Sequence, residues 1–103
     1  WKRLIPIYAT WDDHDFGGNN VDGRLPRKND SLKAFKALWG WTPRGSALMG
    51  PGNSSHVELC GQRFFLMDDR FFRDPDTVPN AHQWGQSQEN WLQTRSLRGF
   101  SRN

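Results

Sequence analysis

Hydrophobic and polar residues follow one another in blocks along this chain, and the blocks predict short elements. Residues 4–11 (LIPIYATW) are an apolar run rich in Ile, Tyr and Trp, which predicts a short buried strand with Pro6 at its start or edge. The run stops at Asp12, and the three glycines of residues 17–23 indicate an irregular loop after it.

A helix is predicted next, because apolar residues recur three or four positions apart. These positions are Leu32, Phe35, Leu38 and Trp39. Asp30 or Ser31 can cap its N-terminus, and Gly40 and Pro43 would end it. Residues 43–55 are rich in Gly and Pro and predict a loop.

Residues 56–69 (HVELCGQRFFLMDD) predict two strands around a tight turn at Cys60 and Gly61. The second strand is a continuous apolar run, which is typical of a strand covered on both faces. Residues 74–83 predict a loop. A last helix is expected at about residues 87–97, with Trp91 and Leu92 facing inward. This order of strands and helices predicts an α/β or α+β fold.

The bulk composition suits one domain and excludes several function classes. The chain has 103 residues and a formal charge of +3, and its basic residues are scattered rather than clustered. A nucleic-acid partner is therefore not expected, and the absence of a long apolar run excludes a membrane span. One residue in seven is aromatic (14%), so we expect part of this apolar surface to pack against polypeptide outside the 103 residues.

The segment after the first predicted strand carries the candidate chemistry. Acids at the end of a strand lie at the edge where α/β proteins place their sites. If the strand continued, alternation would send Asp12 and His14 to one side and Asp13 and Asp15 to the other. The glycines would let Asn19 or Asn20 return to the same centre. Carboxylate and amide oxygens suit hard divalent cations, and His also accepts zinc or iron. The alternative is a turn whose Asp and Asn side chains bind only their own backbone.

A second cluster repeats this design in residues 64–75 (FFLMDDRFFRDP). Asp68 and Asp69 end the apolar run, and Arg70 and Arg73 follow. The planar guanidinium of Arg is suited to phosphate or carboxylate, so an anion site is one interpretation. The other is a pair of structural ion pairs, Asp68 with Arg70 or Asp69 with Arg73.

The remaining candidates are weaker. His56 falls in a predicted strand and is expected to be a packing or surface residue, and His82 lies in a polar loop where a ligand role is not favoured. Cys60 has no basic neighbour in the sequence to lower its pKa, so a nucleophile is not expected there.

The segment TWDDHDFGGNN resembles the signature of the alkaline phosphatase D family, the PhoD-like metallophosphatases. Three further segments resemble this family in order: KNDSLKAFKALWGW, HVELCGQRFFLMDDRFFRDP and WGQSQENWLQTRSL. Met67 stands in place of the usual Leu in HVELCGQRFFLMDDRFFRDP, and Trp84 stands in place of Leu in WGQSQENWLQTRSL. The likeness covers nearly the whole chain, so residues 1–103 are interpreted as a partial PhoD-like metallophosphatase domain.

The resemblance implies a calcineurin-like phosphoesterase, an α/β fold with a two-sheet sandwich flanked by helices. It implies a metal-dependent hydrolase, a phosphatase or phosphodiesterase acting on phosphate esters. Calcium and iron are the metal ions it favours, with manganese, magnesium or zinc as further possibilities. Many members are periplasmic or extracellular.

The resemblance also assigns roles to residues of this chain. His14 would contact the phosphate and protonate the leaving group. Asp12 or Asp13 would ligate metal, with the choice between them open, and Asn19 is a further candidate ligand. Arg70 would support the site electrostatically.

Several ligands that the superfamily uses have no counterpart in this chain. We therefore interpret the chain as the central piece of a larger enzyme, whose remaining segments would be its partner in the site, and expect weak or absent catalysis by these 103 residues alone. The alternatives are a non-catalytic metal- or anion-binding module and, less favoured, a nucleic-acid adaptor.

Overall fold

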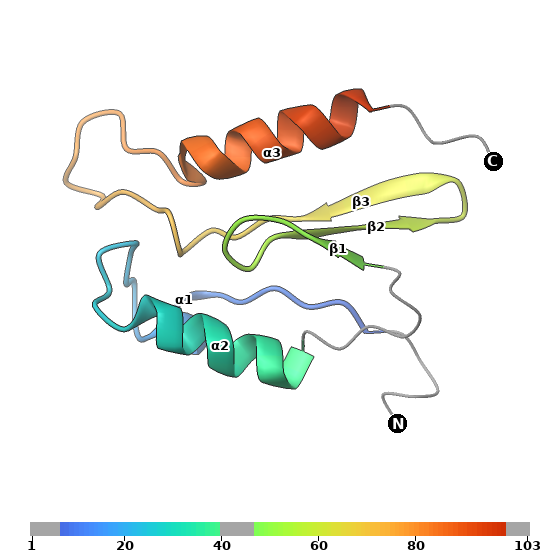
Figure 1. Cartoon of the computed structure of the whole chain (residues 1–103). Coiled ribbons are helices and arrows are strands. Elements are labelled where there is room, and N and C mark those ends of the chain that lie inside the picture. The colour runs from blue at the N-terminus through green and yellow to red at the C-terminus, as the bar shows by residue number, and fades with distance from the viewer. Residues whose placement is uncertain (1–6, 40–46, 99–103) are drawn as a thin grey trace.

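The computed structural model describes residues 7–39 and 47–98, which form three helices and three strands (Figure 1). Figure 1 shows α3 along one face of the sheet, and the opening segment with α2 on the opposite side. In chain order, the elements are α1 (Asp13–Phe16), α2 (Lys28–Trp39), β1 (Ala47–Met49), β2 (Ser55–Leu59), β3 (Gln62–Leu66) and α3 (Gly85–Leu97). The chain is thus a small α/β structure.

The sheet is antiparallel, with strand order β1-β2-β3. The predicted hairpin is confirmed, since β2 and β3 meet in a two-residue turn at Cys60 and Gly61. Both turn residues have a positive φ, 53° at Cys60 and 73° at Gly61. That backbone conformation matches the right-handed twist of paired strands. The described residues form one sheet, so a second sheet of a sandwich stays a prediction.

The loop predicted over residues 43–55 is wrong in part, because Ala47–Met49 pairs with β2 as strand β1. Residues 43–46 lie outside the described residues. The three-residue strand is too short for a periodic pattern. A tight turn then returns the chain to β2, with the Gly50 N–H donating to the Ser54 carbonyl at 2.9 Å.

The strand predicted for residues 4–11 is not formed by its described part, residues 7–11. Residues 4–6 lie outside the described ranges. Side chains rather than a strand ladder hold this segment, as the Thr10 hydroxyl donates to the Met67 carbonyl at 3.0 Å. Trp11 is buried beside Phe16, with ring centroids 5.0 Å apart.

The acidic signature coils into the single-turn helix α1, so strand alternation does not decide where its side chains point. Its acids favour that turn, because the Asp15 carboxylate accepts from the Asp12 N–H at 3.3 Å. Phe16 ends the turn and is fully buried. The helix therefore aims Phe16 into the core and leaves the signature acids near the surface.

The predicted helices are confirmed with shifted starts. The first begins at Lys28 rather than after Asp30 or Ser31, and the last begins at Gly85. Phe35 of α2 packs against Trp11 with ring centroids 5.3 Å apart, while Leu38, another of the apolar positions of this helix, is 62% exposed.

Helix α3 packs on the sheet through Trp91, as predicted, and its neighbour Leu92 is half-buried. The Trp91 ring lies 5.7 Å from Phe65 of β3 and 5.9 Å from His56 of β2. The prediction that β3 is covered on both faces is wrong for the described residues, because Phe64 is 47% exposed. No helix within residues 7–39 or 47–98 has the length and apolar character needed to cross a membrane.

Candidate functional site

Asp68, at the end of the second apolar run, is fully buried and accepts four hydrogen bonds. Its Oδ1 accepts from the Trp11 indole at 2.8 Å and from the backbone N–H groups of Arg70 and Phe71 at 2.9 Å each. Its Oδ2 accepts from the Asn53 N–H at 2.7 Å. One carboxylate thus joins the opening segment, the loop before β2 and the chain after β3, so Asp68 is a structural anchor.

The loop before β2 closes tightly over this carboxylate. Gly52 has a φ of 60°, and a Cβ built on it would lie 2.6 Å from Asp68 Oδ2. Glycine is needed here both for the left-handed backbone and for the close approach.

Helix α3 reaches the same anchor through Gln88, which is fully buried. The Gln88 Oε1 accepts from the Asp68 N–H at 2.7 Å, and its Nε2 donates to the Asp68 carbonyl at 2.8 Å and to the Trp84 carbonyl at 3.1 Å. Sequence reasoning missed this role. The available signal is that Gln88 precedes Trp91 by three residues, which places both on one side of the helix.

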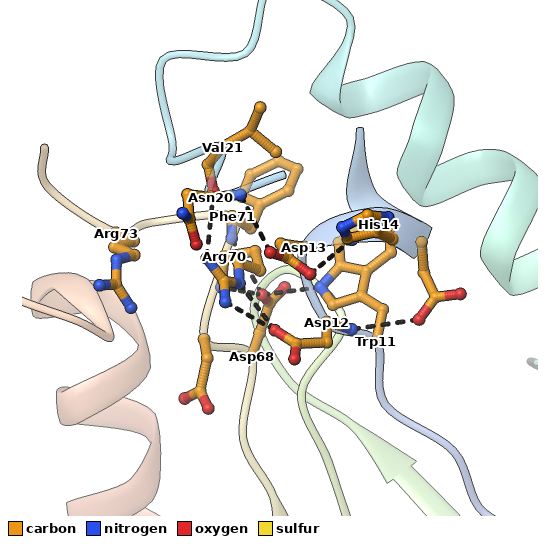
Figure 2. Close-up of polar contacts among 12 residues, drawn as sticks. Trp11, Asp12, Asp13, His14, Asn20, Val21, Asp68, Arg70, Phe71 and Arg73 are labelled. Atoms are coloured by element: carbon orange, nitrogen blue, oxygen red, sulfur yellow. Dashed lines mark hydrogen bonds and ion pairs between the residues drawn. The ribbon is translucent and has the colours of Figure 1, made fainter. Parts of the chain in front are cut away.

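Arg70 is brought to the signature, although 58 residues separate it from Asp12. Its Nε and Nη2 donate to Asp12 Oδ1 at 2.9 and 2.7 Å, and its Nη1 donates to the Val21 carbonyl at 3.5 Å (Figure 2). The Arg70 side chain is 13% exposed, whereas that of Asp12 is 74% exposed. The guanidinium is therefore held mostly inside the protein, with an accessible carboxylate in front of it.

The ion pairs considered from the sequence, Asp68–Arg70 and Asp69–Arg73, are replaced by others. Arg73 pairs with Asp76 at 2.7 Å, and Asp69 accepts from the Trp84 indole at 2.7 Å. Asp68 does not pair with the Arg70 guanidinium because it is buried and its oxygens already accept indole and backbone N–H groups.

Asp13 organises the loop that follows α1. Its Oδ1 accepts from the His14 N–H at 2.8 Å and its Oδ2 from the Asn20 N–H at 2.9 Å. The hydrogen bond from the Asn20 backbone is the main reason that the pKa of Asp13 is lowered, and the His14 backbone adds to it. Asn20 has a left-handed φ of 55°, so the chain turns back toward Asp13 there.

The structure gathers some of the predicted site residues and leaves others apart. Figure 2 shows Asp12, Asp13 and Arg70 around one another, with Asn20 beside them and His14 next to Asp13. His14 and Asn19 are both exposed. The backbone of Asn20, rather than a side chain of Asn19, makes the contact that returns the loop.

The local hydrogen bonds of Asp13 agree with the interpretation of this segment as a self-capping turn. The carboxylates of Asp12 and Asp13 still face the surface together. Within residues 7–39 and 47–98, no group of three or more His, Cys, Asp or Glu side chains is arranged to hold a metal ion. On their own, the described residues therefore do not fit a metal centre.

The weaker candidates from the sequence, His56, His82 and Cys60, lie in three different environments. His56 is a buried packing residue, 4% exposed, in line with one of the two roles expected for it. The His82 Nδ1 lies 3.2 Å from Asp74 Oδ2, and the pKa of that carboxyl is lowered chiefly by the N–H of His82. Cys60 is an exposed free thiol in the hairpin turn.

Comparisons of this chain with protein-family models, with curated proteins and with solved structures find no match. The likeness to PhoD-like enzymes therefore stays a likeness of motifs. Any functional conclusion depends on those motifs and on the geometry around Asp12 and Arg70.

Proposed function

We propose that this chain supplies part of the catalytic face of a metal-dependent phosphoric ester hydrolase of the PhoD-like kind. The observation that carries the proposal is the contact between Arg70 and Asp12. It joins the two clusters that the sequence singled out, although they are distant along the chain. The same two clusters carry the family-like motifs.

Arg70 has the surroundings of a phosphate-binding group. Its side chain is mostly buried, and the Val21 carbonyl and Asp12 hold its orientation. A phosphoryl group carries the same kind of oxygen acceptor as the Asp12 carboxylate. An entering phosphate ester would therefore take over contacts that Asp12 makes, with little reorganisation of the guanidinium.

His14 is the group proposed to move a proton. It lies in α1 beside Asp13, and its imidazole is exposed, so substrate can reach it. The hydrogen bond from its backbone to Asp13 fixes the start of the helical turn that carries the ring. An imidazole in this place would give a proton to the departing alkoxide.

The metal ions need donors beyond the described residues. Asp12 and Asp13 would contribute carboxylates, with Asn19 as a further candidate. Because these do not form a metal centre by themselves, the remaining ligands belong to other parts of the parent polypeptide. Calcium and iron stay the proposed ions, on the resemblance alone.

The test uses the parent polypeptide that contains this chain, with p-nitrophenyl phosphate and bis(p-nitrophenyl) phosphate as substrates and calcium and iron supplied. His14→Gln and Asp13→Ala should each lower kcat by at least about a hundredfold. Arg70→Ala should lower kcat/KM, with Arg70→Lys between it and the wild type because Lys lacks the planar fork. Chelation should abolish turnover.

Matched controls are His82→Gln and Asp76→Ala, which alter an exposed histidine and an exposed acid that bind other partners. Both should leave turnover unchanged. Near-normal rates in His14→Gln and Asp13→Ala would remove these residues from the site. Calorimetric binding of calcium, manganese or iron by the parent without ester hydrolysis would favour a non-catalytic metal-binding module instead.

A further inference from the structure

His56 is a buried histidine of the sheet whose ring has no hydrogen-bond partner among the described residues. The residue lies in β2 and is 4% exposed. Within residues 7–39 and 47–98, neither Nδ1 nor Nε2 has a partner, and the nearby Trp91 Nε1 is also buried and unpartnered. Buried polar atoms in folded proteins are nearly always paired, so this cluster is unusual.

The His56 ring is held by two aromatic neighbours. Phe65 lies across the strand pair, with ring centroids 5.5 Å apart, and Trp91 reaches it from α3 at 5.9 Å. A neutral imidazole fits this setting as a flat, weakly polar ring. An imidazolium would carry a full charge into the same space with no acceptor.

The charged groups around His56 also oppose its protonation. Arg63 on β3 and Arg95 on α3 are positive, and Glu58 on β2 is the opposing negative charge. Glu58 already pairs with Arg63, whose Nε donates to it at 2.9 Å. Burial is the largest cause that lowers the pKa of His56 below its ordinary 6.5, and the two arginines lower it further.

We infer that His56 is an acid-sensitive lock between β2 and α3, which is closed when the imidazole is neutral and opens when it is protonated. Protonation leaves a buried charged ring whose two N–H groups have no acceptor among the described residues, so α3 moves away from the sheet to let water reach the ring. This inference does not depend on the proposed activity.

Movement of α3 away from the sheet would also break hydrogen bonds at the Asp68 anchor. Gln88 lies one helical turn before Trp91 on α3 and binds both backbone polar groups of Asp68. Displacement of α3 would remove those two bonds. Asp68 in turn holds Trp11 and the backbone of Arg70, so the signature would be loosened from the far side of the sheet.

The sign of the pH effect follows from linkage. The pKa of His56 is lower in the folded chain than in the unfolded one, so the open state binds the extra proton. The closed state is fully favoured above pH 6.5 and loses favour as the pH falls toward the folded pKa. In this window the opening constant should rise by about tenfold per pH unit.

The experiment follows the wild-type chain by NMR from about pH 8 to about pH 5, a range that covers histidine titration. The His56 Cε1–H shift reports its protonation, and hydrogen-exchange protection factors of the Gln88–Leu92 amides report docking of α3. We expect His56 to titrate below its ordinary pKa of 6.5, and protection in α3 to fall by about tenfold per pH unit as the pH decreases from 6.5 toward the folded pKa of His56.

His56→Gln and His56→Phe each remove the titrating group, and either one that folds serves as the test variant. In that variant the protection of α3 should no longer depend on pH in this range, while His82→Gln should behave as the wild type. The inference is overturned if His56 titrates at or above its ordinary pKa of 6.5, or if α3 keeps its protection when His56 is protonated. It also fails if the pH dependence persists without His56, or if α3 is unprotected at the highest pH.

Discussion

Asp68 and Asp12 are two carboxylates that both lie beside Arg70, but one is buried and structural and the other is exposed. Asp68 is fully buried and accepts four N–H groups, two of them from Arg70 and Phe71 in its own turn. The Asp12 side chain is 74% exposed and accepts mainly from the Arg70 guanidinium. The difference shows that an acid at the end of an apolar run is structural when backbone donors enclose it. It is a candidate for chemistry when a side-chain cation holds it at the surface.

The two carboxylates also differ in how much each contributes to the free energy of folding, with the larger contribution from Asp68. Each buried donor left without an acceptor costs about 1–3 kcal/mol of folding free energy. An ion pair with one exposed partner, as in Asp12–Arg70, contributes only about 0–1 kcal/mol. Substitutions that remove each acid therefore provide a direct comparison.

The largest expected effect comes from Asp68→Ala, which leaves the Trp11 indole and three backbone N–H groups without their acceptor. The free energy of unfolding should fall by at least about 3 kcal/mol. Urea denaturation followed by circular dichroism measures it. Asp12→Ala is the matched control, with an expected loss below about 1 kcal/mol. Equal losses in the two variants would contradict the distinction between them.

A smaller effect is expected from Gln88→Ala, which removes the link from α3 to the anchor but leaves the Asp68 carboxylate in place. The loss should be about 2 kcal/mol, because the Asp68 N–H and carbonyl lose their side-chain partner in a buried place. Gln86→Ala is the control on the same helix, since Gln86 is exposed and its side chain donates to the exposed Asn90. If both variants unfold at the same urea concentration, the link has no energetic role.

The smallest effect is the coupling between Asp12 and Arg70. A double-mutant cycle with Asp12→Ala and Arg70→Ala should give a coupling free energy of about 0.2–1 kcal/mol. It should weaken as salt is added, because one partner is exposed. A coupling of several kcal/mol that is insensitive to salt would mean that the pair is structural, like Asp68, and would weaken the proposed site.

The elements that the sequence predicted well are those set by local patterns. Helices α2 and α3 follow from apolar spacing, and the β2–β3 hairpin follows from two apolar runs around Cys60 and Gly61. The first helix begins three or four residues before its predicted start, and the last helix begins two residues before its own. Helix ends depend on neighbouring turns, such as the Lys28 N–H donating to the Leu25 carbonyl at 3.2 Å.

The features that the sequence missed depend on distant partners. Strand β1 exists because Ala47–Met49 finds a partner in β2, and the opening segment is held by side-chain contacts in place of a ladder. The approach of Arg70 to the signature was expected only from the resemblance. The buried role of Asp68 could not be read from spacing, because its partners lie up to 57 residues away. The spacing of Gln88 and Trp91 places both on one side of α3, but it does not identify Asp68 as the partner of Gln88.

The reach of the Asp68 anchor has a consequence for how this polypeptide is made. Trp11 emerges from a ribosome before Asp68, the acceptor of its indole N–H, which is made 57 residues later, and Gln88 comes 20 residues after that. Contacts between such distant positions form only once both are free of the exit tunnel. The signature therefore reaches its final conformation only after translation has passed α3, and a ribosome stalled before that point would display those acids on an unanchored chain.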